Sequence, residues 1–262
     1  MKSNKKQLVI VAGAAGELGT AFCKELTKKS IDCISIIRNK AFPYTSPFIK
    51  TITCNLEVEQ EVEEKFSEVE FDNYDEIIYL HTIGIDKFDP RGYPTIHAMS
   101  TIDPHVYNTN VNSFKYLMRF CIRKIRDINT TTNKKVHFKI AIVAGVADKY
   151  APFVIESFCE AKYIVRQYIQ SQVNLYPDWV SGLSINITST ILESALNVRP
   201  NADTTYWFCA QDISEQSIDT LLENENGYKE IELIKKSPEF TEGYYENKEL
   251  LYKKWSKETG IT

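Results

Sequence analysis

The sequence predicts an α/β protein with a single doubly wound parallel sheet and helices on both faces. Two observations support this. Short apolar runs alternate with helix-like segments along most of the 262 residues, which is typical of repeated β-α-β units. The first run, 7–12, is apolar almost throughout, as expected of a strand buried on both faces, and a glycine-rich turn follows it directly. We expect one domain over 1–262.

Seven strands are expected, each from a short run rich in apolar or β-branched residues: 7–12, 33–37, 49–54, 76–80, 139–144, 182–187 and 231–234. Helices are expected where apolar residues recur three or four apart: 16–29, 59–69, 103–128, 155–173 and 213–222. In the first helix, Leu18, Phe22 and Leu26 have this spacing. The third begins with Asp103-Pro104, which supplies an N-cap and a helix-starting proline.

Three segments depart from this alternation. Two prolines in 39–47 predict a loop where a helix would otherwise connect two strands. Residues 188–211 show no clear periodicity, and a long connection of this kind often covers an active site, so we expect a substrate loop there. Residues 244–262 are expected to form a polar helical tail ending near Gly260.

Composition excludes several classes of protein. Hydrophobic residues make up 43% of the chain and charged residues 25%, which is ordinary for a globular protein. The net charge of −4 predicts no nucleic-acid partner, and no apolar run approaches the roughly 18 residues of a membrane span. The six cysteines are widely spaced, so neither a disulfide framework nor a metal site is indicated. A cytoplasmic protein is the expectation.

The glycine turn carries the strongest chemical signal. Gly13, Gly16 and Gly19 lie between the first strand and the first helix. Glycine permits a tight turn and a close approach of the backbone to a pyrophosphate, whose charge the helix N-terminus favours. This arrangement predicts a dinucleotide site, although a turn that serves only packing is the alternative.

At this point the sequence resembles the short-chain dehydrogenase/reductase family, over about residues 7 to 235, which implies a Rossmann-like fold. Later landmarks occur in the family's order: Asn55-Leu56, then His81-Thr82-Ile83-Gly84, then Asn110-Val111, then Lys162. The resemblance implies that the cofactor contacts Gly13, Ala15, Gly16, Glu17, Leu18, Gly19, Asn55, Leu56, His81, Thr82 and Lys162. It also implies a homodimer or homotetramer that pairs the two long helices.

The end of the second strand bears on the choice of cofactor. An acidic residue there would favour NAD(H), whereas an arginine accommodates the 2′-phosphate of NADP(H). This sequence has Arg38 directly after the strand and no adjacent carboxylate. NADP(H) is therefore predicted over NAD(H), and a solvated charge at a strand end is the alternative.

The reaction centre departs from the family. Members usually carry Tyr-x-x-x-Lys on a helix, with the tyrosine as general acid or base, and a serine thirteen residues before the tyrosine. Lys162 fits the lysine, but Phe158 stands at the tyrosine position and Gly145 at the serine position. Tyr150 is the best substitute acid by chemistry. The only Tyr-x-x-x-Lys, Tyr244 to Lys248, lies in the tail and is interpreted as coincidence.

Three functions compete on this basis. In the first, the chain is an oxidoreductase that acts on a carbonyl or alcohol of a small molecule, and the acid is Tyr150 or a water held by Asn110 and Lys162. Alternatively, it is an inactive member that serves as a binding or partner subunit. The third possibility is a lyase or isomerase built on the same fold. Fold does not decide among them, so the site must.

Overall fold

The computed structural model describes residues 5–39, 41–85, 102–149, 155–223, 225–238, 240–244 and 247–260. Seven parallel strands form a sheet in the order β3-β2-β1-β4-β5-β6-β7, which confirms the predicted fold class. They are β1 (Gln7–Ala12), β2 (Asp32–Ile37), β3 (Ile49–Thr53), β4 (Glu76–His81), β5 (His137–Gly145), β6 (Val180–Ile187) and β7 (Gly227–Leu233). The strand order reverses between β1 and β4, and such switch points open a crevice at the carboxyl ends of the strands.

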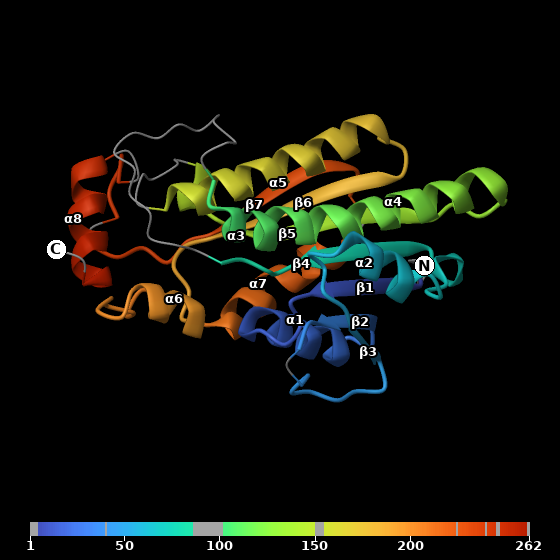
Figure 1. Ribbon diagram of the computed structural model, residues 1–262, viewed down its shortest axis with the longest axis horizontal. Coiled ribbons are helices and arrows are strands. Elements are labelled where there is room, and N and C mark those ends of the chain that lie inside the picture. Colours follow the sequence, from blue (N-terminus) through green and yellow to red (C-terminus); the bar gives the residue numbers. More distant parts are fainter. Residues whose placement is uncertain are drawn as a thin grey trace.

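Helices cover both faces of the sheet (Figure 1). One face carries α1 (Glu17–Lys28) and α7 (Ala210–Leu222), and the other carries α2 (Glu59–Phe66), α4 (Ser113–Thr131) and α5 (Glu156–Leu175). Side chains alternate along β1 accordingly. Leu8 and Ile10 join the core beneath α2, α4 and α5, while Val9 and Val11 join the core beneath α1 and α7. Two further helices, α6 (Glu193–Val198) and α8 (Lys248–Thr259), lie beyond the carboxyl ends of the strands (Figure 1).

The predicted long helix contains a π-helical turn. It begins as α3 (Pro104–Tyr107), passes through Asn108–Asn112 in π geometry and continues as α4. The Asp103 carboxylate accepts hydrogen bonds from the backbone N–H groups of His105 (2.9 Å) and Val106 (3.2 Å), which confirms the N-cap. π-turns are rare and frequently occur at functional sites.

Several predicted bounds are corrected. The helix predicted to reach residue 69 ends at Phe66, and a 3₁₀ turn follows at Phe71–Asn73. Residues 188–211 contain the short helix α6, the first two residues of α7 and a bridge between Thr190 and Phe208. The last strand begins at Gly227, earlier than predicted. Gly260 ends α8 with a φ of 72°, a conformation that glycine adopts without strain.

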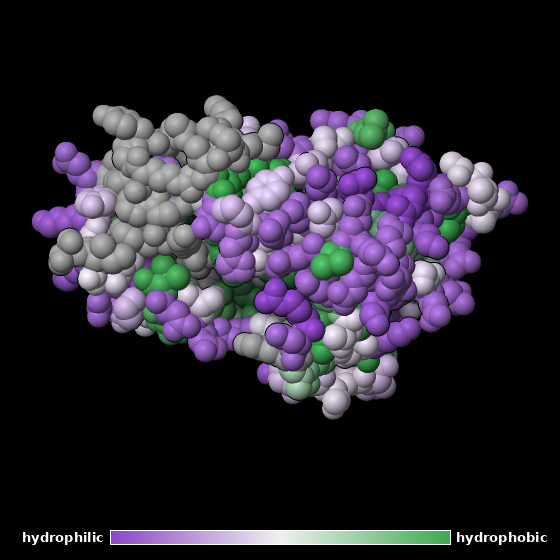
Figure 2. All heavy atoms as spheres, in the orientation of Figure 1, coloured by the Kyte–Doolittle hydropathy of each residue, from purple (hydrophilic) through white to green (hydrophobic). Residues whose placement is uncertain are grey.

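The apolar residues of α4 pack on the chain's own sheet. Phe114, Leu117 and Met118 are at most 1% exposed, whereas Ile164 and Tyr168 on α5 are half-buried. On the face shown in Figure 2, hydrophobic side chains occur in small separate groups among hydrophilic ones. In the parts of the chain that the structure describes, no helix is both long and apolar enough to cross a membrane.

Candidate functional site

The glycine turn has the geometry that its sequence predicts. Gly13 has a φ of 79°, and a side chain there would meet Ile83 Cγ1 at 2.9 Å. Its carbonyl accepts a hydrogen bond from the Gly16 N–H at 3.0 Å. A Cβ on Gly19 would lie 2.2 Å from Gly13 O, so Gly19 is required for the helix to approach the turn. By contrast, a Cβ on Gly16 would meet only Gly13 O, at 3.2 Å.

The N-terminus of α1 has no side-chain cap. Its first-turn amides are therefore available to an anion. Glu17, the first helical residue, does not turn back to cap them. Its carboxylate instead accepts a hydrogen bond from the Glu193 N–H at 2.8 Å and so connects the glycine turn with the start of α6. Sequence analysis placed Glu17 among the cofactor contacts and missed this connection.

Arg38 has a partner that sequence analysis missed. Its Nη1 lies 3.1 Å from the Glu57 carboxylate, which also accepts a hydrogen bond from Thr109 Oγ1 at 3.0 Å. No carboxylate adjoins Arg38 in sequence, but the turn after β3 brings one beside it. The Arg38 side chain is 57% exposed and remains accessible to a ligand.

Asn55 and Leu56 lie in that same turn. The Asn55 side-chain oxygen accepts a hydrogen bond from the Glu57 N–H at 3.2 Å, and its own N–H donates to Glu61 at 3.0 Å. Leu56 is buried. The Asn55 side chain therefore shapes the entry into α2.

His81 and Thr82 at the end of β4 differ in their surroundings. His81 is fully buried, with Nδ1 2.9 Å from Tyr79 Oη and its ring packed edge-on against Phe114. Burial, together with nearby Lys162, holds the pKa of His81 well below its ordinary value. The resemblance implies a cofactor contact at His81, but its side chain has no exposed surface from which to make one. Thr82 lines the cavity, and its hydroxyl donates to Ala12 O at 2.7 Å.

Lys162 and Asn110 meet around Gly84. The Lys162 ammonium donates to the carbonyl oxygens of Ile83 (3.1 Å) and Val143 (3.3 Å). A Cβ on Gly84 would lie 3.2 Å from that ammonium, so glycine leaves room for it. The Asn110 amide is bonded to the backbone N–H and C=O of Ile85, both at 2.9 Å. Asn110 therefore holds the segment after β4.

A cavity of about 900 Å³ connects these elements at the carboxyl ends of the strands. Leu18 and Thr82 line its glycine-loop end. Gly145, Phe158 and Lys162 line its centre, where the Phe158 ring centroid lies 5.4 Å from the Lys162 ammonium. Two tyrosines, Tyr206 and Tyr244, also line the cavity. Tyr150, the predicted substitute acid, lies outside the described residues.

A buried ionic network adjoins Gly145 and was missed by sequence analysis. The Asp148 carboxylate accepts hydrogen bonds from the Gly145 N–H (3.2 Å) and from Arg166 Nη2 (2.8 Å). Arg166 also donates to Asn186 at 2.7 Å. Burial raises the pKa of the Asp148 carboxyl above its ordinary value, although Arg166, the Gly145 N–H and Lys162 act in the opposite direction. Arg166 lies far from both Asp148 and Asn186 in sequence, so no local motif reports this network.

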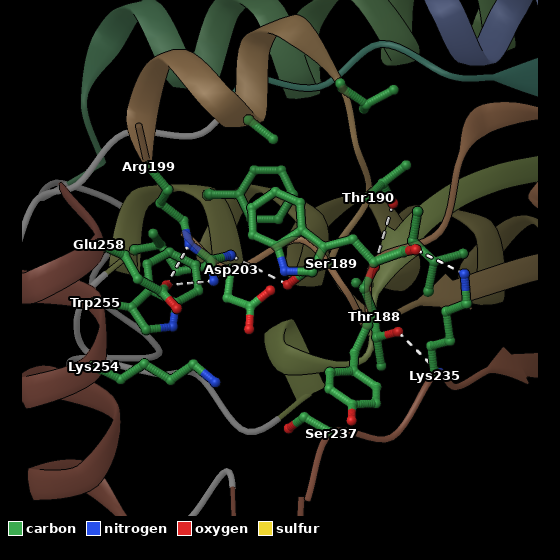
Figure 3. A pocket seen from close by; sticks show the side chains of 18 of the residues that line it. Thr188, Ser189, Thr190, Arg199, Asp203, Lys235, Ser237, Lys254, Trp255 and Glu258 are labelled. Atoms are coloured by element: carbon green, nitrogen blue, oxygen red, sulfur yellow. Dashed lines mark hydrogen bonds and ion pairs between the residues drawn. The ribbon is translucent and has the colours of Figure 1, made fainter. Parts of the chain in front are cut away.

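The far end of the cavity is formed by α6, α8 and the segments around them (Figure 3). Arg199 forms a buried ion pair with Glu258, with Nε to Oε2 at 2.8 Å. Its guanidinium lies 4.5 Å from the Trp207 ring centroid and 4.1 Å from that of Trp255. This pair fastens α8 to the segment that follows α6. Part of the predicted substrate loop and part of the predicted tail thus share one wall.

Two sequence interpretations concern other side chains. Tyr244 lines the cavity, but α8 begins at Lys248, so Tyr244 and Lys248 do not share a helical turn. Within the described residues, no group of three or more His, Cys, Asp or Glu side chains could hold a metal ion.

Comparison by sequence and by structure gives different results. No protein-family model matches the chain, and no curated protein sequence matches it. Solved structures do match. A short-chain dehydrogenase from Burkholderia cenocepacia in complex with NADP has a TM-score of 0.68 at 14% identity, over 95% of this chain and 96% of that chain. Serine dehydrogenase from Escherichia coli has a TM-score of 0.66 at 14% identity, over 87% and 97%.

A tyrosine-to-phenylalanine variant of ElxO with NADPH bound is also similar, with a TM-score of 0.65 at 12% identity, over 87% of this chain and 97% of that chain. At such identities the likeness concerns the fold and not the activity. It extends over nearly the whole of each chain. The protein therefore has the fold of the short-chain dehydrogenases/reductases.

Proposed function

We propose that the chain binds NADP(H) and acts as an oxidoreductase on a carbonyl or alcohol group of a small molecule. One observation carries the proposal. A single cavity runs from Leu18, in the first turn of α1, to the ammonium of Lys162. A nucleotide with its pyrophosphate at α1 would reach the centre of that cavity with its reactive ring.

The residues present fit such a nucleotide. The first-turn amides of α1 lack a side-chain cap, and Gly16, which precedes them, has no side chain to cover them. In the Burkholderia structure of the same fold, NADP is bound. Lys162 would hold the ribose next to the reactive ring, and the cofactor itself would supply or accept the hydride.

Arg38 supports NADP(H) over NAD(H). Its guanidinium is exposed on one side and contacts Glu57 on the other. A 2′-phosphate would form charge-assisted hydrogen bonds with this guanidinium, in competition with the Glu57 carboxylate. Glu57 is also the group that would favour NAD(H), because a carboxylate can accept hydrogen bonds from the ribose hydroxyls.

A second function, nucleotide and ligand binding without hydride transfer, is favoured by one observation. The phenyl ring of Phe158 occupies the space beside Lys162, and a phenyl ring has no proton to give. Hydroxyls elsewhere in the cavity, on Thr188, Ser189 and Thr190, can orient a ligand, but alcohols of this kind are poor general acids. Tyr150 remains the candidate for a substitute acid.

Calorimetry with the two nucleotides tests the binding proposal. Wild-type protein should bind NADP more tightly than NAD. Arg38→Ala should lower the affinity for NADP about tenfold, the size expected for the loss of a charged hydrogen bond. NAD affinity should not fall in the same variant. Glu57→Gln is the matched control, since it frees Arg38 and should strengthen NADP binding. Equal affinities for both nucleotides in the wild type would refute the NADP preference.

Hydride transfer is tested by following NADPH absorbance with a panel of ketones and aldehydes. Turnover that disappears in Tyr150→Phe would establish a relocated acid. Binding of NADPH without turnover would favour the second function.

A further inference from the structure

The charge on the cavity wall is opposite to that of the whole protein. The chain carries a net charge of −4. Among the described residues that line the cavity, six are basic and two are acidic: Lys162, Arg199, Lys235, Lys253, Lys254 and Lys257, against Asp203 and Glu258. The cavity therefore has an excess of four positive charges and attracts anions from solution.

The basic side chains of the cavity differ in their partners. Glu258 neutralises Arg199 within the buried pair, and Lys235 donates to the Trp207 carbonyl at 2.9 Å. No carboxylate of a described residue lies within ion-pair distance of Lys253 or Lys257, which project from one face of α8 four residues apart. Lys254 extends into the same space as Asp203 in Figure 3. Two of the surplus charges, those of Lys253 and Lys257, therefore lie on α8.

The position of α8 is fixed by the buried pair. Arg199 contacts two indole rings and bonds Glu258 through Nε and Nη2, and the Asn201 N–H donates to Glu258 O at 2.9 Å. The α8 lysines are thus presented by an anchored helix. The wall between them and the centre is aromatic, formed by Tyr206, Trp207 and Trp255.

We propose that the far end of the cavity binds the carboxylate of an organic acid, whose carbonyl or alcohol group lies at the centre beside Lys162. The substrate class is then an aldehyde, ketone or alcohol that carries a carboxylate on an apolar or aromatic body. The aromatic wall accommodates that body, and Lys253 and Lys257 hold the carboxylate. This proposal rests on the proposed function only for the position of the carbonyl or alcohol group beside Lys162.

Two isosteric probes test it: 4-carboxybenzaldehyde, which is anionic, and 4-formylbenzamide, which is neutral. Their dissociation constants are measured by ligand-observed NMR on the full chain, with and without NADPH. We expect the anionic probe to bind about tenfold more tightly, as two or three exposed charge pairs provide. The double variant Lys253→Gln/Lys257→Gln should lose about fivefold of the affinity for the anionic probe and none for the neutral one.

The double variant Lys24→Gln/Lys50→Gln is the matched control, because it removes two exposed lysines remote from the cavity and should change neither constant. Equal binding of the two probes, or an equal loss of both in the α8 variant, would overturn the proposal. So would a fall in NADPH affinity without a change for the anionic probe, since the lysines would then serve the nucleotide. Failure of the chain to bind NADPH at all would instead refute the proposed function. The carboxylate site would still be tested in that case, because the probes are also measured without nucleotide.

Discussion

The glycine-loop end and the centre of the cavity are built from different kinds of group. At the glycine-loop end, backbone amides and a positive φ at Gly13 form the site, and few side chains are needed. At the centre, Lys162 and Asn110 keep defined contacts, but Gly145 and Phe158 present no hydroxyl. A site made of backbone depends on few side chains, whereas a donor pair made of side chains requires particular residues at both positions.

The largest expected effect comes from restoring that pair. Gly145→Ser with Phe158→Tyr would place two hydroxyls beside Lys162, on the residues that already line the centre. General acid catalysis contributes about 10²–10⁴-fold, so NADPH oxidation with a carboxylated aldehyde should rise by that order. The two gains need not add, because both groups act on one oxygen.

Adding Lys162→Ala to the double variant is the control and should abolish the gain. If the double variant folds, binds NADPH and still turns over no faster than wild type, the centre was identified wrongly. Strong turnover by the wild type that survives Lys162→Ala would lead to the same conclusion.

Two glycines of the turn separate folding from ligand binding. Gly19→Ala should destabilise the protein by about 3 kcal/mol, because the new Cβ would lie 2.2 Å from Gly13 O. Gly16→Ala adds a Cβ at a residue whose φ of −80° suits any side chain, so it should fold normally and bind NADPH more weakly. Urea unfolding and calorimetry distinguish the two. Equal loss of stability in both variants would mean that the turn serves packing alone.

The sequence predicts the elements that depend on local signals, but it does not predict features that leave no local signal. Apolar runs and the glycine turn are local signals, so the strands, α1 and the Asp103 cap were found. The π-turn at Asn108–Asn112 was not, since a single wide turn is too short to leave a periodic signal of its own.

Contacts between distant segments were also missed. Glu57 beside Arg38 and the Asp148–Arg166 pair both join residues far apart in sequence. His81 was expected to contact the cofactor, and the burial of its side chain was missed for a related reason. Its place after a strand was evident, but the alternation that turns its side chain into the core beneath α4 depends on the sheet.

His81 is fully buried and should make stability depend on pH. Its pKa in the folded protein is well below 6.5, so below that pH the unfolded chain binds the proton and the folded chain does not. Stability therefore falls as pH decreases below about 6.5, by up to about 1.4 kcal/mol per pH unit. Urea midpoints at a series of pH values measure this slope, and His81→Gln should reduce it. An unchanged slope would mean that His81 charges in the folded state.

The smallest expected effect concerns Glu17, which connects the glycine-loop end of the cavity with the start of α6 through its hydrogen bond to Glu193. A carboxylate in the first turn of α1 repels a pyrophosphate bound at the same amides. Because Glu17 is exposed, the repulsion is screened, and Glu17→Gln should strengthen NADPH binding only about twofold to threefold.

Glu17→Ala distinguishes charge from the connection to α6. Glutamine can still accept the hydrogen bond from the Glu193 N–H, whereas alanine cannot. Both variants should therefore bind NADPH more tightly, but only alanine should speed amide hydrogen exchange at the start of α6, because a cap is worth about 1 kcal/mol to the first turn. Weaker NADPH binding in both variants would show that the carboxylate assists the nucleotide. The glycine-loop end would then depend on a side chain, as the centre does, and the contrast between the glycine-loop end and the centre would lose its basis.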